Sequence, residues 1–549
     1  KEAYEIDREN GDTFWTDAIT KEMQNVYVAF QIKGPGEKAP PDYKHIPHRL
    51  IFEIKLDFTR KARLVAGGHK TDPPVQMTYS SVVSRESVRI AFLIAALNDI
   101  DLMAADVGNA YLNAPTKEKV YIVTGPEFGP EEGRVAVVIR ALYGLKSSGA
   151  QWRSHFAATL RDLGFQSCLA DPDVWLRPTT KDTGDEYYEY ILVYVDDLLV
   201  CSHNAAQILN ELQDRYKYRL KDVGPPKRYL GAKIDRYELD HKRSTWSLSA
   251  QEYLEKALPI VEQRQGTLAV NKVHTPLPSG YHPELDESSF LSPDGVELYQ
   301  SYVGTLRWAV ELGRIDLTFS TSLMARFAAC PREGHMENII HIFAYIKKHI
   351  RSKLVFDPYT RDWSNIQWIE HEWDEFYPGA QEIIPPNAPK PRGKPVQINL
   401  FCDAAHANDY ITRRSTTGII IFLNGSPISW YSKRQNTIES STFGSEFVAL
   451  KIATEQNEAL RYKLRMLGIP IDGASNIFCD NKSVVQNVTD PASTLSKKHN
   501  AICYHKVRES VAAGVQRIAF ERGMYNVADF LTKNLVPSKL KDCCRCALF

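Results

Sequence analysis

Apolar and polar residues recur along the front half of the chain at spacings that predict a mixture of helices and strands. Apolar positions three and four residues apart indicate amphipathic helices, and alternation indicates half-buried strands. Ser84 stands where a capping side chain would open one of the helices. The patterns predict helices over 13–28, 84–97, 151–163 and 205–220, and strands over 50–56, 61–68, 101–107, 135–139 and within 188–201.

The back half of the chain is divided by two linkers. A loop rich in Pro, Gly and Ser covers 276–295, and the linker 378–395 holds six prolines, which makes it the strongest predicted domain boundary. Before the first linker, the patterns predict a hairpin over 229–248 and a helix over 250–258, and between the linkers they predict helices within 297–349. Beyond the second linker, they predict strands at 398–402, 418–423, 476–479 and 516–521, a long helix over 441–465, and a last helix opened by Asp529.

Composition narrows the class of protein. The 549 residues are long enough for about three or four domains. Apolar residues at 43% and charged residues at 24% exclude a wholly disordered chain. Lys+Arg and Asp+Glu both number 67, so any basic surface for nucleic acid must be local. Nine cysteines without zinc-box spacing indicate a reducing compartment. The longest apolar stretch is too short to span a membrane, and the start without Met predicts a segment of a longer precursor.

Two adjacent acids interrupt the most apolar run of the chain. Asp196 and Asp197 stand between the apolar stretches 190–195 and 198–200, which predicts two buried strands joined by a tight turn. A buried pair of like charges is costly unless cations neutralise it; a solvated acidic hairpin tip is the alternative. Asp106 ends another predicted strand. Three such carboxylates can hold two divalent cations for an in-line phosphoryl transfer, and Mg²⁺ suits them because it shares phosphate oxygens.

Four segments, in order, resemble reverse transcriptases of copia-type LTR retrotransposons. The sequence YVDD at 194–197 resembles the YxDD box, and ADVGNAYLN at 105–113 is similar to the first acidic motif of that family. The sequence ALYGLKSSGAQW at 141–152 resembles the LYGLKQAPRAW segment, and RKARLVAGG at 60–68 resembles the YKARLVARG strand, with Gly67 in place of the usual Arg. The resemblance implies that Asp106 and Asp196 are the chief metal ligands, with Asp197 as a weaker ligand or a supporting carboxylate.

The same resemblance implies a set of substrate-binding residues. Tyr111 matches the aromatic gate against a ribose 2′-hydroxyl, with a packed core tyrosine as the alternative reading. Lys61 and Arg63 would neutralise a triphosphate, unless they are solvated strand charges. Gly144 would permit close backbone approach to nucleotide and template. The remaining candidates are Lys146 at a phosphate, or as a surface lysine, and Leu230 and Gly231 in YLGAKI at 229–234, which is similar to the FLGIEI hairpin that serves as primer grip.

A second set of acids lies in the back half. Asp403, Glu446, Asp480 and Asp529 follow a strand, lie in a helix, end a strand and open a helix, and this order resembles ribonuclease H. The sequence SPISWYSKRQ at 426–435 is similar to the ISWKSKKQ stretch of the copia-type family. The resemblance implies that these four carboxylates hold two Mg²⁺ ions around a scissile phosphate.

Two departures from that pattern bear on the nuclease. Where the family has SSTEAEY, this chain has STFGSEF at 441–447. Glu446 matches the family's catalytic Glu, but the residues around it differ. Some ribonucleases H carry a His in the loop before the last Asp, but the loop 521–527 has none. His505 belongs to a different stretch, similar to RYHFIRE, and we interpret it as structural or substrate-facing. Slower product release or a changed metal preference would follow from the missing His.

A helical segment between the two acid sets is basic. From 300 to 353 there are four acidic residues and eight basic ones: Arg307, Arg314, Arg326, Arg332, Lys347, Lys348, Arg351 and Lys353. This excess predicts a surface that tracks duplex phosphates without reading sequence, with an ordinary solvated face as the alternative.

Taken together, the resemblance implies an α/β and α+β multidomain fold. A right-hand polymerase would place fingers and palm at 1–225, a thumb with a primer-grip hairpin at 226–290, and a connection and linker at 291–395. An α/β ribonuclease H-like domain would follow at 396–549. The implied enzyme is an RNA- and DNA-dependent DNA polymerase that also cuts the RNA strand of RNA–DNA hybrids. A catalytically retired nucleic-acid-binding scaffold and a nuclease-dominant protein are the alternatives.

The implied cofactor is Mg²⁺, two ions per active site, with Mn²⁺ as a substitute. The implied partners are an RNA template, a DNA or RNA primer, RNA–DNA hybrid duplex and dNTPs, with integrase and capsid segments of the same precursor and no membrane. The expected location is the cytoplasm, within virus-like particles, with the nucleus as an alternative alongside the cDNA.

Overall fold

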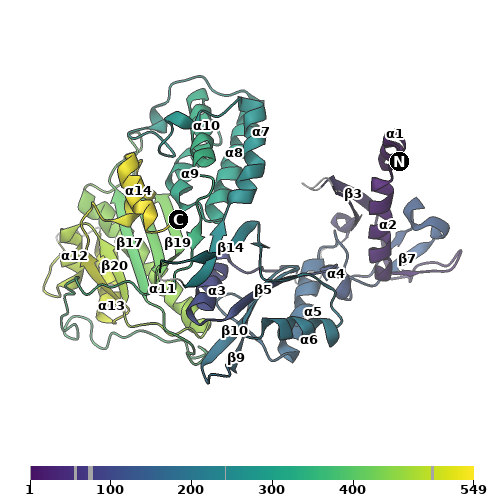
Figure 1. Cartoon of the computed structure of the whole chain (residues 1–549), viewed down its shortest axis with the longest axis horizontal. Coiled ribbons are helices and arrows are strands. Elements are labelled where there is room, and N and C mark those ends of the chain that lie inside the picture. Colours follow the sequence, from purple (N-terminus) through teal and green to yellow (C-terminus); the bar gives the residue numbers. More distant parts are fainter. Residues whose placement is uncertain (1, 55–58, 72–77, 241–242, 496–499) are drawn as a thin grey trace.

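The computed structural model describes residues 2–54, 59–71, 78–240, 243–495 and 500–549. Figure 1 shows N-terminal elements standing apart at one end, a central sheet, a group of helices beside it, and a C-terminal α/β region at the other end. No helix in the described part of the chain has the length and apolar composition that crossing a membrane would require.

The N-terminal region combines two helices with short strands. Its sheets are β1-β7-β6-β2 and the hairpin β3-β4, and both share one apolar core with the helix α2. The elements are α1 (Glu2–Asn10), α2 (Phe14–Val26), β1 (Phe30–Ile32), β2 (Lys44–His45), β3 (His48–Ile54), β4 (Arg60–Ala66), β6 (Val120–Val123) and β7 (Val135–Val138).

A six-stranded sheet in the order β12-β5-β11-β10-β9-β8 forms the centre of the molecule. Alternation along β10 divides its residues between two cores: Tyr190 and Leu192 face one, and Ile191 and Val193 face the other. The elements are α3 (Arg85–Leu97), β5 (Asp101–Val107), α4 (Ala110–Asn113), α5 (Ser148–Asp162), β8 (Gln166–Ser167), β9 (Val174–Thr180), β10 (Glu186–Tyr194), β11 (Asp197–Ser202), α6 (Ala205–Asp214) and β12 (Leu220–Gly224).

Helices cover both faces of this sheet. Residues of α5 and α6 pack on the face of Ile191, and residues of α3 pack on the other face. Ser84 caps α3 as predicted, because its Oγ accepts from Ser87 N at 3.2 Å. The helix predicted over 205–220 is wrong in its second half. The α6 helix ends at Asp214, and Lys217 adopts a φ of 60° that turns Tyr218 back toward α5.

A small sheet, β13-β14-β15-β16, and a group of helices follow. The predicted stop at Leu258 is wrong, since α7 runs on through Pro259. The buried face of α7 carries Leu254, Leu258 and Val261, while Pro259 is on the exposed face, where water can satisfy the freed carbonyl. The elements are β13 (Arg228–Tyr229), β14 (Ala232–Glu238), β15 (Ser244–Ser249), α7 (Gln251–Gln265), α8 (Pro293–Glu311), α9 (Thr318–Ala325), α10 (Glu333–Lys348) and β16 (Leu354–Val355).

The C-terminal region is a five-stranded sheet in the order β19-β18-β17-β20-β21. The first three strands are antiparallel, and β20 and β21 run parallel to β17. The elements are β17 (Ile398–Ala405), β18 (Thr416–Leu423), β19 (Ser426–Arg434), α11 (Thr442–Met466), β20 (Ser475–Cys479), α12 (Lys482–Thr489), α13 (Ala501–Ala512), β21 (Gln516–Phe520), the 3-10 turn η8 (Val527–Leu531) and α14 (Pro537–Arg545).

The linker 378–395 contains no regular helix or strand, as predicted, yet it is fixed to both halves of the molecule. Lys394 N donates to Asn98 Oδ1 of the front half at 2.9 Å, and Arg392 N donates to Gly468 O of the C-terminal half at 2.9 Å. One apolar core joins α3, the helical group and the C-terminal sheet. The central region and the C-terminal region therefore pack against each other and are not joined by the linker alone.

Candidate active sites

The central sheet brings the first three acids together through strand register. Asp106 of β5 and Asp197 of β11 are directly opposite each other in an antiparallel pair. Val107 N donates to Asp196 O at 2.8 Å, which fixes the adjoining turn against the end of β5. The three carboxylates predicted from the sequence thus lie together where two neighbouring inner strands of the sheet, β5 and β11, meet the turn after β10.

The turn between β10 and β11 holds a strained residue. Val195 has a φ of 58°, in the left-handed region that a β-branched side chain rarely adopts. Its carbonyl accepts from Trp152 Nε1 at 2.7 Å, and the Trp152 side chain is buried under the sheet. This hydrogen bond holds the turn, and with it the position of Asp196.

Burial and mutual repulsion perturb these acids. Burial, followed by the charges of Asp196 and Asp106, raises the pKa of Asp197 to about 6. Burial and the charge of Asp196 also raise the pKa of Asp106, while Lys221 and Lys61 act in the opposite direction. A cation beside the three carboxylates would remove this penalty.

Three of the predicted substrate-binding residues, Tyr111, Arg63 and Lys61, lie near these acids. The Tyr111 ring lies 4.9 Å from the Tyr143 ring between centroids, and burial, followed by the charge of Asp196, raises the pKa of Tyr111. The Arg63 guanidinium lies 5.3 Å from the Tyr143 ring centroid. Lys61 acts electrostatically on Asp106, so β4 presents positive charge toward the acids.

Gly144 and Lys146 have partners within the protein. Gly144 has a φ of 92°, and a Cβ there would lie 2.1 Å from Ala66 O of β4, so the packing of the chain itself requires glycine. Lys146 Nζ donates to Thr71 O at 2.6 Å. Contact of either residue with nucleotide or template stays a prediction.

Leu230 and Gly231 form the turn of the β13-β14 hairpin. Tyr229 pairs with Ala232 around them, and their φ values of 49° and 83° are those of a tight two-residue turn. The Tyr229 hydroxyl donates to Leu192 O of β10 at 3.4 Å, so the hairpin lies against the strand that leads to the Asp196 turn.

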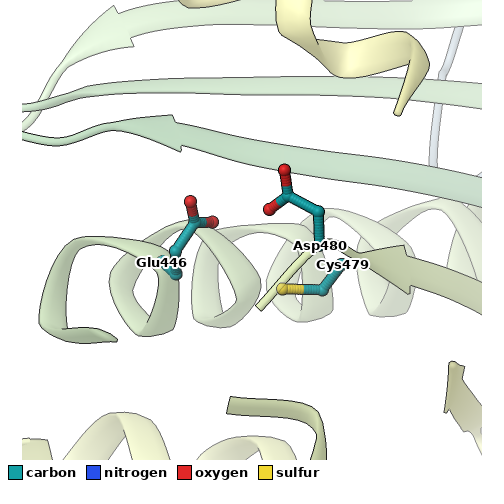
Figure 2. A group of neighbouring side chains, drawn as sticks. All are labelled: Glu446, Cys479 and Asp480. Carbon is teal, nitrogen blue, oxygen red and sulfur yellow. The ribbon is translucent and has the colours of Figure 1, made fainter. Parts of the chain in front are cut away.

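The four acids of the back half also converge, in two groups that share Asp480. Carboxylate oxygens of Asp403, Asp480 and Asp529 lie within 4.8 Å of one another, and so do ligand atoms of Glu446, Cys479 and Asp480. Asp403 lies within β17, Glu446 in the first turns of α11, and Asp480 directly after β20. Figure 2 shows Glu446 and Asp480 with their carboxylates on the same side of α11.

Asp529 lies in a different element from the one predicted. It belongs to the 3-10 turn η8, whereas the last helix, α14, starts only at Pro537. Asn526 caps the turn, since its Oδ1 accepts from Ala528 N at 3.1 Å, and its Nδ2 donates to Cys402 O at 2.9 Å. These bonds fix the turn against β17, and this places Asp529 beside Asp403.

The sequence analysis missed two lysines in this cluster. Lys533 Nζ lies 2.8 Å from Asp529 Oδ1 and 3.6 Å from Asp403 Oδ2, and Lys539 also pairs with Asp529. Burial raises the pKa of Asp403 to about 7, with Lys533 opposing and Asp529 adding to the shift. The spacing of four between Asp529 and Lys533 is typical of pairs on one helical face and could have revealed the first lysine.

The loop 521–527 approaches the acids without a histidine. A Cβ on Gly523 would lie 3.0 Å from Asp480 Oδ2. His505 instead accepts or donates a hydrogen bond with the Tyr377 hydroxyl, at 2.9 Å.

The basic segment 300–353 is only partly available to a ligand. Arg314 is fully buried in an ion pair with Asp316, so its inclusion in a phosphate-binding surface is wrong. Arg326 pairs with Asp409, and Lys347 Nζ lies 2.7 Å from Glu262 Oε1. Much of the excess charge therefore serves internal packing.

The comparisons with known proteins agree with the geometry of the first site. Residues 37–277 match the family model described as reverse transcriptase (RNA-dependent DNA polymerase). The chain is 26% identical over 545 residues to the retrovirus-related Pol polyprotein from transposon TNT 1-94 of Nicotiana tabacum, covering 96% of this chain and 37% of that protein. It is 25% identical over 537 residues to the Pol polyprotein from transposon RE1 of Arabidopsis thaliana, covering 95% of this chain and 33% of that protein.

A shorter relative matches the chain at a similar level. The putative transposon Ty5-1 protein of Saccharomyces cerevisiae is 27% identical over 339 residues, covering 60% of this chain and 92% of that protein. The N-terminal RNase H domain of a Mycobacterium tuberculosis protein, solved as a fusion with maltose binding protein, covers 27% of this chain and 97% of that one. Its 12% identity and TM-score of 0.19 carry no argument.

These findings define a protein with a reverse transcriptase domain. The chain is similar over nearly its whole length to Pol polyproteins of retrotransposons, and it spans about a third of the length of the two Pol polyproteins it matches. The motifs singled out in the sequence lead to the same family.

Proposed function

We propose that this chain is an RNA- and DNA-dependent DNA polymerase with a fused ribonuclease H that cleaves the RNA strand of RNA–DNA hybrids. The observation that carries the polymerase half is the pairing of Asp106 with Asp197 beside the Asp196 turn, inside the matched reverse transcriptase region. The convergence of Asp403, Glu446, Asp480 and Asp529 supports the nuclease half. The division into fingers and palm, thumb, connection and nuclease stays part of this proposal.

The second site shows the clearer fit to divalent cations, because among the described residues only its acids form groups of three with ligand atoms within 4.8 Å of one another. In the second site, Glu446 is 6% exposed, and its Oε2 has no hydrogen-bond partner among the described residues. A buried, unpaired carboxylate oxygen is costly, and hard oxygen donors are the ligands that Mg²⁺ prefers. When bound, two Mg²⁺ ions at each site would activate the attacking oxygen and stabilise the leaving group.

The roles of the other side chains follow from their places around the first site. Lys61 and Arg63 on β4 supply positive charge on the side from which a triphosphate would approach Asp106. Tyr111, whose ring is tilted by 54° against that of Tyr143 and lies close to Asp196, would exclude a ribose 2′-hydroxyl. Leu230 and Gly231 would hold the primer end from the hairpin turn.

The substrates proposed are an RNA or DNA template, a primer 3′-end and dNTPs for the first site, and the emerging hybrid for the second. Recognition of the hybrid would rest on its shape and on 2′-hydroxyls, so it should be largely independent of sequence. Action in the cytoplasm within particles, beside other segments of the precursor, belongs to the same proposal.

Primer extension tests the polymerase. We expect the chain to extend oligo(dT) on poly(rA) with dTTP and Mg²⁺, and we expect Asp196→Asn, which keeps the side chain's shape, to reduce the rate by roughly 10³-fold or more. Chelation of the metal should stop the reaction. Extension no faster than that of Asp196→Asn would instead support a retired nucleic-acid-binding scaffold.

A further inference from the structure

A thiol lies beside the acids of the second site, and the proposed mechanism does not use it. Ligand atoms of Glu446, Cys479 and Asp480 lie within 4.8 Å of one another. Figure 2 shows the Cys479 sulfur directed toward the Glu446 side, with the Asp480 carboxylate above it. Cys479 is fully buried at the end of β20, so this arrangement is set by the sheet and by α11.

Glu446, whose unpaired oxygen also fits a cation in the proposed mechanism, is the second sign that this group lacks a ligand. Its side chain is 6% exposed and accepts one backbone hydrogen bond, from Ala404. Its Oε2 is buried and has no hydrogen-bond partner among the residues described. Leaving such an oxygen unpaired costs free energy that a cation would recover.

The donor set of this group differs from that of Asp403, Asp480 and Asp529. The latter offers oxygen alone and already contains Lys533. Glu446, Cys479 and Asp480 offer one sulfur with two carboxylates, and sulfur ligands favour Zn²⁺ over Mg²⁺. A zinc–sulfur bond is about 2.3 Å long, so two ligand atoms on opposite sides of a zinc ion lie about 4.6 Å apart. The ligand atoms of this group lie within 4.8 Å of one another, so they could bind one ion after only small shifts of the side chains.

We propose that Glu446, Cys479 and Asp480 form a binding site for a thiophilic divalent cation of the Zn²⁺ class. Binding converts the Cys479 thiol to a metal thiolate and releases its proton to solvent. Three protein ligands leave one position of a four-coordinate ion open. Cys402, the partner of Cys479 in the parallel strand pair, has its thiol beside that of Cys479 and also donates to Phe478 O at 3.5 Å, but it is not among the three ligand atoms that lie within 4.8 Å of one another.

A regulatory consequence follows, and it rests on the proposed nuclease function. A zinc ion bound by Cys479, Glu446 and Asp480 would occupy two carboxylates that the proposed nuclease mechanism assigns to Mg²⁺. Low concentrations of Zn²⁺ should therefore inhibit RNA cleavage while leaving DNA synthesis at the first site unaffected.

Titration of the full chain with Zn²⁺ and Co²⁺ tests the site without nucleic acid. We expect a thiolate-to-cobalt charge-transfer band, and calorimetric Zn²⁺ binding, in the unsubstituted protein and in Cys201→Ser. Cys201 is a matched control because it is equally buried, on β11, and donates to Ala91 O instead. Cys479→Ser should lose the band and bind Zn²⁺ at least roughly 10–100-fold more weakly, since even loss of an outer-shell partner costs that much.

The proposal is overturned if Cys479→Ser shows the same band and the same Zn²⁺ affinity as Cys201→Ser. Circular dichroism would establish that Cys479→Ser is folded. If it is not, Glu446→Gln provides the second test, because it retains the thiol but should also weaken Zn²⁺ binding. Unchanged affinity in Glu446→Gln would then overturn the site.

Cleavage assays separate this inference from the proposed function. Zn²⁺ inhibition is measured for each variant relative to its own zinc-free rate. Absence of any RNA cleavage would contradict the nuclease, while a binding difference at Cys479 would still support the metal site. Cleavage with equal Zn²⁺ binding in Cys479→Ser and Cys201→Ser would leave the nuclease standing and contradict the site.

Discussion

Seven carboxylates gather at two places in this molecule, and burial raises the pKa of five of them: Asp106, Asp197, Asp403, Glu446 and Asp480. Asp403 and Asp529 are almost wholly buried, and the lysines 533 and 539 compensate them in part. Asp196 depends on a strained valine and a tryptophan hydrogen bond for its position. Buried acids held in this way destabilise the fold locally, which is typical of functional sites.

The raised pKa of Asp197 predicts a pH-dependent stability. Burial, then Asp196 and Asp106, raises that pKa to about 6, against roughly 3.9 for an unfolded carboxyl. Because the folded state holds the proton more tightly, ionisation of this group lowers the free energy of unfolding as pH rises from about 4 through about 6. In metal-free buffer, Asp197→Asn should match the parent near pH ~4 and exceed it by roughly 1 kcal/mol near pH ~7.5, discounted for solvent screening.

Chemical denaturation at several pH values would measure this difference. Asp182→Asn, at an exposed hairpin position of the same sheet, should show no such pH dependence. A constant difference between Asp197→Asn and the parent from pH ~4 to ~7.5 would contradict the account of this carboxyl.

The seven acids could be predicted from the sequence, whereas their neighbours could not. Strand ends and the order of motifs pointed to each acid. The contact of Lys533 with Asp403, and the place of Cys479 beside Glu446, depend on how β17, β20, α11 and the segment after η8 meet. Those contacts join residues far apart in the chain, and no local pattern encodes them.

At the scale of elements, the linker 378–395 shows what a proline count can and cannot predict. The prolines correctly exclude helix and strand, but the segment is tied down by charges. Glu382 accepts from Arg461 Nε at 2.9 Å and from Arg465 Nε at 3.1 Å, both on α11. Burial would raise the pKa of Glu382, but the two arginines outweigh it and lower the pKa to about 2.

Glu382→Gln should loosen the linker. The neutral amide loses both charge-assisted pairs, and a loss of about 1.4 kcal/mol would raise the opened population tenfold. We expect faster tryptic cleavage after Arg392, which precedes Gly393, above pH ~5. The stabilisation by Glu382 itself should be lost as pH falls toward ~2. Glu375→Gln, at an exposed position just before the linker, is the matched control. Equal cleavage rates for the two variants would show that Glu382 does not restrain the segment.

At the scale of the whole molecule, one buried arginine connects three regions. Arg89 of α3 donates to Glu311 O at the end of α8, at 2.8 Å, and to Ile428 O of β19, at 3.1 Å. Its guanidinium lies 3.9 Å from the Trp430 ring centroid. Burial lowers the pKa of Arg89 to about 10, so the side chain remains charged near neutrality.

Arg89→Met should uncouple the two halves of the molecule. The change leaves the buried Ile428 carbonyl and the partly buried Glu311 carbonyl without this donor, which should cost about 1–3 kcal/mol. We expect calorimetry to show one unfolding transition in the parent and two in Arg89→Met. Arg161→Met, which removes an exposed arginine near Trp175, should change stability by no more than about 0.5 kcal/mol. A single transition at the parent's temperature in Arg89→Met would contradict this role.

The overall layout was predictable only in outline. Periodicity predicted the longer helices and the strands that carry the acids, but it did not predict β6, β8, β9 or β12. The packing of the C-terminal sheet on α3 depends on pairs such as Arg89 and Ile428, 339 residues apart. A proline-rich stretch predicts where regular structure stops, but not whether the regions beside it pack together.

The central claim is that the molecule holds two separate catalytic sites. A hybrid substrate with both strands labelled, assayed for DNA synthesis and RNA cleavage, tests it with Asp106→Asn and Asp480→Asn side by side. We predict that Asp106→Asn abolishes synthesis and retains cleavage, and that Asp480→Asn does the reverse. Equal loss of both activities in each variant would contradict the claim.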